Sequence, residues 1–329
     1  MIPSCRFFLF VFLLMPSVVM AQKYQDAAGT LNVALVINPY NGDRAGPEVD
    51  VDAEAMADGG LIDTLANRGV AVQRISKIAL SEEEEKQYGR WNRFGMANGH
   101  LAAFAAANEK AGYFNIGLYN NCSSAPGMLG GLQQASAGGE PLKVALVWID
   151  AHGDYNTPET TLSGMLGGMP LAVAAGHALT RLRKQAGLDP ALPTEHIVMA
   201  CVRDTDPLEQ ERIDDSLIEH ISVADVRSLS DTIREQMERL SRITDLIYIH
   251  IDLDVLDPEE VAGHPLTVPD GPTSRELAAA LEVMFRYEKA AALGIASYPA
   301  DDDPDKTTLK AVHRLVVGAV KGLLGREHY

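Results

Sequence analysis

The sequence predicts one three-layer α/β domain built on a parallel sheet, and two observations support this fold class. Short, continuously apolar runs recur along the chain, and longer stretches with helical periodicity lie between them. Strands that are apolar on both faces are typical of parallel sheets covered by helices on both sides. No break in composition marks a domain boundary, so we expect residues 22–329 to form a single domain.

The predicted elements follow from these patterns in chain order. The apolar runs predict strands at 31–37, 70–75, 114–119, 144–150, 196–201, 220–223, 246–252 and 292–297. Helical periodicity predicts helices at 53–67, 93–111, 171–186, 228–240, 274–286 and 309–324. Thr307 and Thr308 are predicted to cap the last helix. The acidic run at 81–85 is predicted to be an exposed turn.

The overall charge is strongly negative, which excludes one class of function. The 329 residues include 28 Lys and Arg against 45 Asp and Glu, a formal net charge of −17. Proteins that bind the phosphates of nucleic acids need clustered basic residues instead. We therefore expect no nucleic-acid partner and look for a small-molecule site.

The first residues resemble an export signal. Arg6 precedes an apolar stretch at 7–19, and Val19 and Ala21 place small residues before a cut after Ala21. We therefore predict that 1–21 is a signal peptide and that the mature protein is periplasmic or secreted, without membrane association. An uncleaved anchor is the alternative, although the stretch is shorter than the roughly 20 residues of a comfortable membrane span.

Polar residues gather where four of the predicted strands end, and two of these clusters predict a metal centre. Asp150, His152 and Asp154 follow one strand, and Asp252 and Asp254 follow another. Residues i and i+2 of an extended segment point to the same side, so each set converges. Such a cluster repels itself unless cations bind, and two divalent ions that share a water suit metal-assisted hydrolysis. The alternative is solvated turn acids or helix caps.

Two motifs resemble the ureohydrolase (arginase–agmatinase) family. They are the segments 150–164 (DAHGDYNTPETTLSG) and 252–258 (DLDVLDP), with weaker support from 203–206 and 271–276. The resemblance implies an α/β/α sandwich with an eight-stranded, mainly parallel sheet. It also implies hydrolysis of a guanidino or amidino C–N bond by a dinuclear centre, most often manganese. Relatives are often trimers or hexamers, so a homo-oligomer is expected.

The resemblance also assigns roles to the metal ligands. Asp150 and Asp252 match the carboxylates that bridge both ions. Asp154 matches a ligand of the first ion, and His152 and Asp254 match ligands of the second.

Three further residues match the positions that bind an amino-acid substrate. Asn156 and Ser163 correspond to residues that hold its α-carboxylate, and Asp206 to the one that reaches its α-amino group. These matches imply an arginine-like substrate rather than a decarboxylated amine.

The chain departs from the family pattern at three positions. Cys122 stands where the family has a His ligand of the first ion, Gly167 where arginases have a His that shuttles protons, and Ala296 where the family has a Glu that pairs with the guanidinium. A thiolate ligand would favour Zn²⁺, Co²⁺ or Ni²⁺ over Mn²⁺. The alternatives for Cys122 are a small unliganded residue or a disulfide with Cys201, which we otherwise expect to be a buried strand residue.

A histidine elsewhere offers a substitute for the missing proton shuttle. His264 follows the second aspartate motif and could act as general acid or base, and the alternative is an exposed loop histidine. The candidate catalytic residues are therefore Asp154 and His264. His250 shares a strand face with Asp252 and is expected to support or pack beneath the ligands.

The sequence thus predicts an exported, metal-dependent hydrolase of an arginine-like compound, either arginine or N-hydroxyarginine, that uses hydroxide held by two ions. One alternative is another amidine hydrolase, with a formimino or small guanidine substrate. A second alternative is a periplasmic binding protein that keeps the metal cluster but has weak or no turnover.

Overall fold

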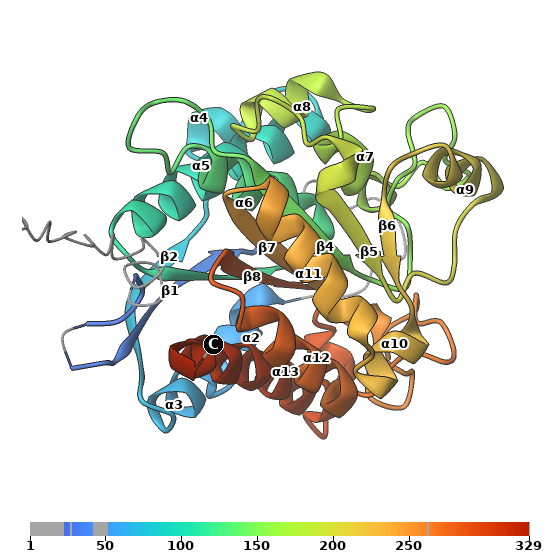
Figure 1. Ribbon diagram of the computed structural model, residues 1–329. Helices are drawn as coiled ribbons and strands as arrows, with labels where there is room; N and C mark the ends of the chain where they lie inside the picture. The colour runs from blue at the N-terminus through green and yellow to red at the C-terminus, as the bar shows by residue number, and fades with distance from the viewer. Residues whose placement is uncertain (1–22, 27, 42–51, 262, 329) are drawn as a thin grey trace, which may run out of the picture.

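The computed structural model describes residues 23–26, 28–41, 52–261 and 263–328, so the predicted signal peptide lies outside the described residues. Within these ranges no helix combines the length and the apolar character needed to cross a membrane. The chain forms three layers, with helices on both faces of one central sheet (Figure 1).

The sheet has eight strands in the order β2-β1-β3-β8-β7-β4-β5-β6. Every neighbouring pair of these strands is parallel. The predicted strands are confirmed, each to within two residues at either end: β1 (Leu31–Asn38), β2 (Val70–Lys77), β3 (Phe114–Tyr119), β4 (Val144–Ile149), β5 (Ile197–Ala200), β6 (Glu219–Ile221), β7 (Leu246–Asp252) and β8 (Ala290–Ala296).

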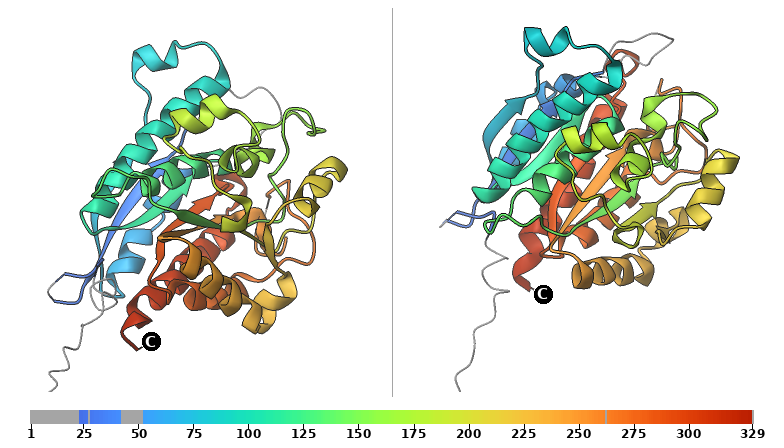
Figure 2. Two further views of the ribbon diagram at one scale, coloured as in Figure 1. Left: turned by 45° about the horizontal axis from the view of Figure 1, so that its top comes forward. Right: turned by 90° about the horizontal axis from the view of Figure 1, so that it is seen from above.

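Helices cover both faces of the sheet (Figure 2). Two hydrophobic clusters, one on each face, join these helices to it. One face packs against α2 (Ala53–Asp58), α3 (Leu61–Ala66), α10 (Val223–Ser228), α11 (Asp231–Ile243), α12 (Ser274–Phe285) and α13 (Thr307–Leu324). The other face packs against α5 (Arg90–Lys110), α6 (Ala125–Gln133), α7 (Pro170–Ala174) and α8 (Thr180–Gln185).

Several helix predictions need correction. The helix predicted at 53–67 is two short helices, α2 and α3, because Gly60 adopts a left-handed φ of 90° between them. The helix predicted at 171–186 is divided in the same way into α7 and α8, with Gly176 at φ 82°. The acidic run is not a plain turn but an exposed one-turn helix, α4 (Glu82–Glu85), capped by Ser81. The sequence does not predict helices α6, α9 (Pro207–Asp214) and α10.

The cap predicted for the last helix was also wrong. Thr307 and Thr308 lie inside α13, and the residue at its N-cap position, Lys306, makes no side-chain cap. The carboxylate of Asp303 does this instead, because it accepts the backbone N–H groups of Thr308 at 3.2 Å and Leu309 at 2.9 Å. These N–H groups have no partner within the helix, so an acceptor from the preceding loop satisfies them.

Candidate metal centre

The candidate site lies where the central strands β3, β7 and β4 end, at the carboxyl edge of the sheet. Cys122 begins a 3₁₀ turn (Cys122–Ser124) shortly after β3, and Asp150 directly follows β4. Asp252 is the last residue of β7, and Asp254 lies in the next 3₁₀ turn, Leu253–Val255. Ligands of open parallel sheets bind at this edge, because loops from several strands converge there.

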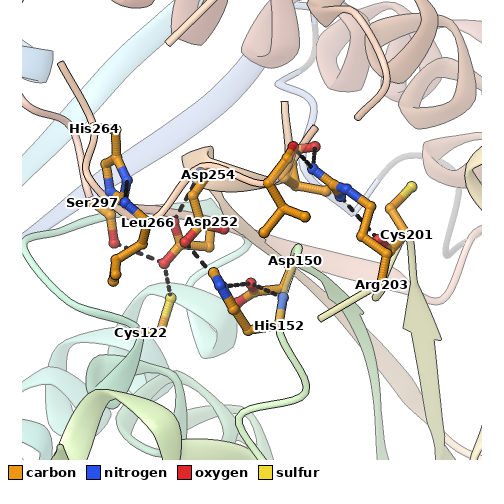
Figure 3. Close-up of polar contacts among 12 residues, drawn as sticks. Cys122, Asp150, His152, Cys201, Arg203, Asp252, Asp254, His264, Leu266 and Ser297 are labelled. Carbon is orange, nitrogen blue, oxygen red and sulfur yellow. Dashed lines mark hydrogen bonds and ion pairs between the residues drawn. The ribbon is translucent and has the colours of Figure 1, made fainter. Parts of the chain in front are cut away.

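Six of the side chains form three overlapping groups, each with ligand atoms within 4.8 Å of one another. The two carboxylates predicted to bridge the ions, Asp150 and Asp252, lie together in one of these groups (Figure 3). The groups are Cys122 with Asp150 and Asp252, Asp150 with His152 and Asp254, and Asp252 with Asp254 and His264.

Short polar contacts fix the orientation of these side chains. Nδ1 of His152 lies 3.4 Å from Oδ1 of Asp150 and 3.2 Å from Oδ2 of Asp254. The thiol of Cys122 donates to Oδ2 of Asp252 at 2.7 Å, and the backbone N–H of Asp254 donates to Oδ1 of the same carboxylate at 3.1 Å.

The carboxylates are electrostatically strained when no cation is bound. Burial, followed by repulsion from Asp150, raises the pKa of Asp254 to about 6. Burial also raises the pKa of Asp150 and Asp252, and it raises the pKa of Asp154 well above its usual range. Burial would lower the pKa of His152, but its hydrogen bonds to Asp150 and Asp254 outweigh this effect and raise it to about 12.

This donor set fits two divalent cations. Oδ1 of Asp254 is buried and has no hydrogen-bond partner among the described residues, so a lone pair is left for a ligand. Burial, and then the charges of Asp252 and Asp150, raise the pKa of the Cys122 thiol, so a nearby cation is what would convert it to thiolate. Carboxylates and imidazole suit borderline-hard ions, and the sulfur adds a soft donor.

Asp154 belongs to the site but not to the three tight groups. Its side chain is buried, and its φ of 48° is in the left-handed region that rarely suits non-glycine residues. The carbonyl oxygen of Asp154 accepts the N–H groups of Leu171 and Ala172 in α7, and this holds the loop against the helix. Its carboxylate interacts electrostatically with Asp150, which places it beside the cluster.

Two of the three predicted substrate-binding residues lie together. Nδ2 of Asn156 donates to Oδ2 of Asp206 at 3.1 Å, and the N–H of Leu162 donates to the same oxygen at 3.4 Å. Ser163 is the next residue of that loop, but its side chain is exposed and its hydroxyl accepts only the N–H of Met165 among backbone groups, at 3.2 Å.

His264 is not an exposed loop histidine, so that alternative is wrong. Its side chain is buried, and the backbone N–H of Leu266 donates to its Nδ1 at 3.3 Å. The loop that carries it is held by Arg203, whose guanidinium donates to the carbonyl oxygens of Val255 at 3.1 Å and Val268 at 2.8 Å. Contacts with residues distant in the sequence therefore hold His264 close to the carboxylates of Asp252 and Asp254, and the local sequence does not reveal them.

The two cysteines of the described chain are not bonded to each other, so the disulfide alternative is wrong. Cys122 contacts Asp252 instead. Cys201 is buried as predicted, although it lies just after β5 with a φ of 66°.

The departures at Gly167 and Ala296 place no charged side chain at these two positions. A Cβ atom at Gly167 would lie 3.4 Å from Nδ2 of Asn121, whose Oδ1 is held by the N–H of Ser123. The methyl group of Ala296 is buried beside Asp252, its register partner on β7.

Sequence reasoning missed two residues that hold the site. The hydroxyl of Ser297 donates to Oδ2 of Asp252 at 2.7 Å. The buried carboxylate of Glu209 accepts the N–H of Tyr155 at 2.7 Å and that of Asp206 at 3.1 Å, so it joins the first ligand loop to α9. The spacing from Asp206 to Glu209 is that of a capping box and could have revealed the second residue.

The fold and the site define a three-layer α/β protein with a candidate dinuclear metal centre, and comparison with known proteins identifies the family. Residues 102–320 match the model of the arginase family. The arginase of Bacillus caldovelox is 30% identical over 273 residues, which is 80% of this chain and 90% of that protein. The arginase of Bacillus subtilis is 28% identical over 304 residues, 90% of this chain and 98% of its own length. The chain therefore belongs to the arginase family.

Solved structures agree with this assignment. The Bacillus caldovelox arginase structure superposes with a TM-score of 0.76 at 27% identity, and covers 88% of this chain and 98% of its own. Formimidoylglutamase from Bacillus subtilis shares the fold, with a TM-score of 0.67 at 17% identity, 89% of this chain and 87% of its own. The prediction of a ureohydrolase-type sandwich is confirmed.

Proposed function

We propose that this protein hydrolyses a C–N bond in the guanidino group of an arginine-like amino acid and binds two divalent metal ions to do so. The observation that supports it most is that three buried aspartates, Asp150, Asp252 and Asp254, are each shared between two of the overlapping ligand groups. When bound there, a pair of ions lowers the pKa of a water molecule and provides a nucleophile at neutral pH.

The chain divides its ligands between two positions. Cys122 and Asp154 would bind the first ion and His152 and Asp254 the second, with Asp150 and Asp252 between them. The family favours Mn²⁺, and the sulfur of Cys122 shifts the preference toward Co²⁺, Ni²⁺ or Zn²⁺.

The substrate backbone would be held by the loop that follows the first ligand motif. Asn156 and Ser163 offer hydrogen-bond donors for an α-carboxylate, and Asp206 offers an acceptor for an α-amino group. The hydrogen bond from Asn156 to Asp206 keeps the donor for the α-carboxylate next to the acceptor for the α-amino group. This arrangement favours an amino acid over agmatine, which has no carboxylate.

His264 is proposed to exchange a proton with the reacting group. Because Nδ1 accepts a backbone N–H, the proton of the neutral ring lies on Nε2, and Nε2 would be the atom that gives or takes the proton. Asp154, which would bind the first ion, is the second proposed catalytic residue.

N-hydroxyarginine is the second candidate substrate, because the site offers a free guanidinium few acceptors. At Ala296 a methyl group replaces a carboxylate, and above Gly167 the nearest polar group is the amide donor of Asn121. A guanidinium has only donors, whereas an N-hydroxyl adds an acceptor oxygen. We also propose that the mature protein is exported after cleavage of 1–21 and forms a homo-oligomer.

The test is turnover by the mature protein loaded with Mn²⁺, Co²⁺ or Ni²⁺. We expect urea from arginine or hydroxyurea from N-hydroxyarginine, and little reaction with agmatine, formiminoglutamate or guanidine. Asp252→Asn should abolish turnover, and His264→Asn should lower it while metal content stays unchanged. If no substrate reacts with any metal but arginine still binds, the protein is a binding protein and the proposal is wrong. Reaction with formiminoglutamate alone would support the other amidine hydrolase.

A further inference from the structure

One oxygen of the Asp252 carboxylate accepts two side-chain hydrogen bonds. Both bonds reach Oδ2 at 2.7 Å, one from the thiol of Cys122 and one from the hydroxyl of Ser297. Figure 3 shows both contacts meeting at this one oxygen. Cys122 follows β3 and Ser297 follows β8, and β8 lies between β3 and β7 in the sheet. The two donors therefore reach Asp252 from different strands.

The backbone of Ser297 is in an unfavourable conformation. Its φ of 70° lies in the left-handed region, where side chains other than that of glycine meet the following carbonyl group. The N–H of Ser297 donates to the carbonyl oxygen of Tyr119 at 3.1 Å, which fixes this turn at the end of β8. Two more residues of the same edge, Asp154 and Cys201, also have positive φ values, of 48° and 66°. Such strain is concentrated at functional sites.

A glycine would fit this conformation without strain, so the hydroxyl must account for a serine here. The hydroxyl is well placed for one task, because it gives a neutral donor to a carboxylate that is surrounded by other acidic groups. It gives that carboxylate a hydrogen bond without adding a charge of its own. It also restricts the rotation of the carboxylate, so that Oδ2 stays beside the sulfur of Cys122.

We propose that Ser297 is a positioning residue of the metal centre, which holds the carboxylate of Asp252 ready to share a cation with Cys122. This inference rests on the metal centre of the proposed function but not on the substrate. Partners that orient metal ligands typically contribute about 10-fold to 100-fold to metal affinity. We expect loss of the Ser297 hydroxyl to weaken binding at the Cys122 position by at least about 10-fold.

The experiment measures metal binding to the purified mature protein, with Co²⁺ as the probe. Co²⁺ bound to sulfur gives a charge-transfer absorption, so the band reports only the position that includes Cys122. Titration against a chelator gives the affinity for wild type, Ser297→Ala and Ser297→Gly. Both variants should bind Co²⁺ more weakly at the sulfur position. The glycine variant should unfold at a higher temperature than the alanine variant, because only glycine removes the strain.

Lys306→Gly is the matched control. Lys306 also has a positive φ, 54°, but it is exposed and lies at the start of α13. This variant should gain thermal stability and bind Co²⁺ like wild type.

Two results would overturn the proposal. One is wild-type Co²⁺ affinity in both Ser297 variants, which would leave the residue a purely structural role. The other is absence of the sulfur band in the wild type, which would separate Cys122 from the ion. Neither result depends on turnover. An inactive protein that still shows weakened Co²⁺ binding in the Ser297 variants would contradict the proposed hydrolase and support this inference.

Discussion

The buried imidazole of His250 should make a contribution to the free energy of unfolding that decreases in acid. His250 is fully buried two residues before Asp252, between the rings of Trp148 at 4.4 Å and Tyr119 at 6.1 Å. Burial lowers its pKa to about 3, whereas a histidine in the unfolded chain titrates near 6.5. Between these values only the unfolded state takes up this proton, so the contribution of His250 to stability is complete above about pH 6.5 and is lost as the pH decreases toward 3. From pH 7 to pH 4.5 the contribution lost is about 2.5 kcal/mol, while buried carboxylates with raised pKa values, such as Asp254, change stability in the opposite direction.

His250→Phe removes this proton site, and we expect its unfolding free energy to depend less on pH. At pH 7 the variant should be less stable by about 1–3 kcal/mol, because the hydroxyl of Tyr248 loses its partner Nδ1 at 2.8 Å. At pH 4.5 that deficit should vanish or reverse. The assay is urea unfolding of the metal-free protein at both pH values.

Tyr248→Phe is the matched control, since it removes the same hydrogen bond but keeps the histidine. Its deficit relative to wild type should therefore be equal at the two pH values. If His250→Phe and wild type lose the same stability between pH 7 and pH 4.5, the reasoning about the buried neutral imidazole is refuted.

Two further predictions concern a metal ligand and a helix cap. Cys122→His should shift the relative metal affinity from Co²⁺ and Zn²⁺ toward Mn²⁺ by more than the roughly tenfold that changes outside the ligand set cause. A competition titration measures these relative affinities. If they are unchanged, the sulfur is not a ligand. Asp303→Ala should lower the unfolding free energy by about 1–2 kcal/mol, since two N–H groups of α13 lose their acceptor, and Asp303→Asn should recover most of this in urea unfolding. Equal stability of wild type and Asp303→Ala would rule out the cap.

Sequence periodicity predicts the central sheet of this fold well and its glycine-rich helix poorly. The inner strands are apolar on both faces, a pattern that short helices rarely share. Helix α6 was missed because Pro126 and three glycines read as loop signals, yet all nine of its residues are buried. The glycines serve close packing: a Cβ atom at Gly130 would lie 2.3 Å from the carbonyl oxygen of Ala186. That requirement exists only in the folded molecule.

The same distinction applies to the site. Asp150 and Asp252 can be predicted, because alternate residues at a strand end must point the same way. Ser297 cannot, since its contact depends on β8 lying between β3 and β7 and on a left-handed backbone. The position of His264 depends on Arg203, which is distant in the sequence and donates to the carbonyl oxygens of Val255 and Val268 on either side of the His264 loop.

The departures at Cys122 and Ala296 have opposite effects on the number of acidic groups near the proposed ions. The family pattern has a neutral imidazole at the first position and a carboxylate at the second, whereas this chain has an ionisable thiol and a methyl group. Under the proposed function the number of acidic groups near the centre would therefore be unchanged, with one of them at a metal ligand instead of beside the substrate. A carboxylate restored at 296 would lie beside Asp252, its register partner, and would add repulsion where burial already raises the pKa of Asp252. Ala296→Glu alone should thus weaken metal binding, and only its combination with Cys122→His should restore the balance of charge that a cationic guanidinium requires.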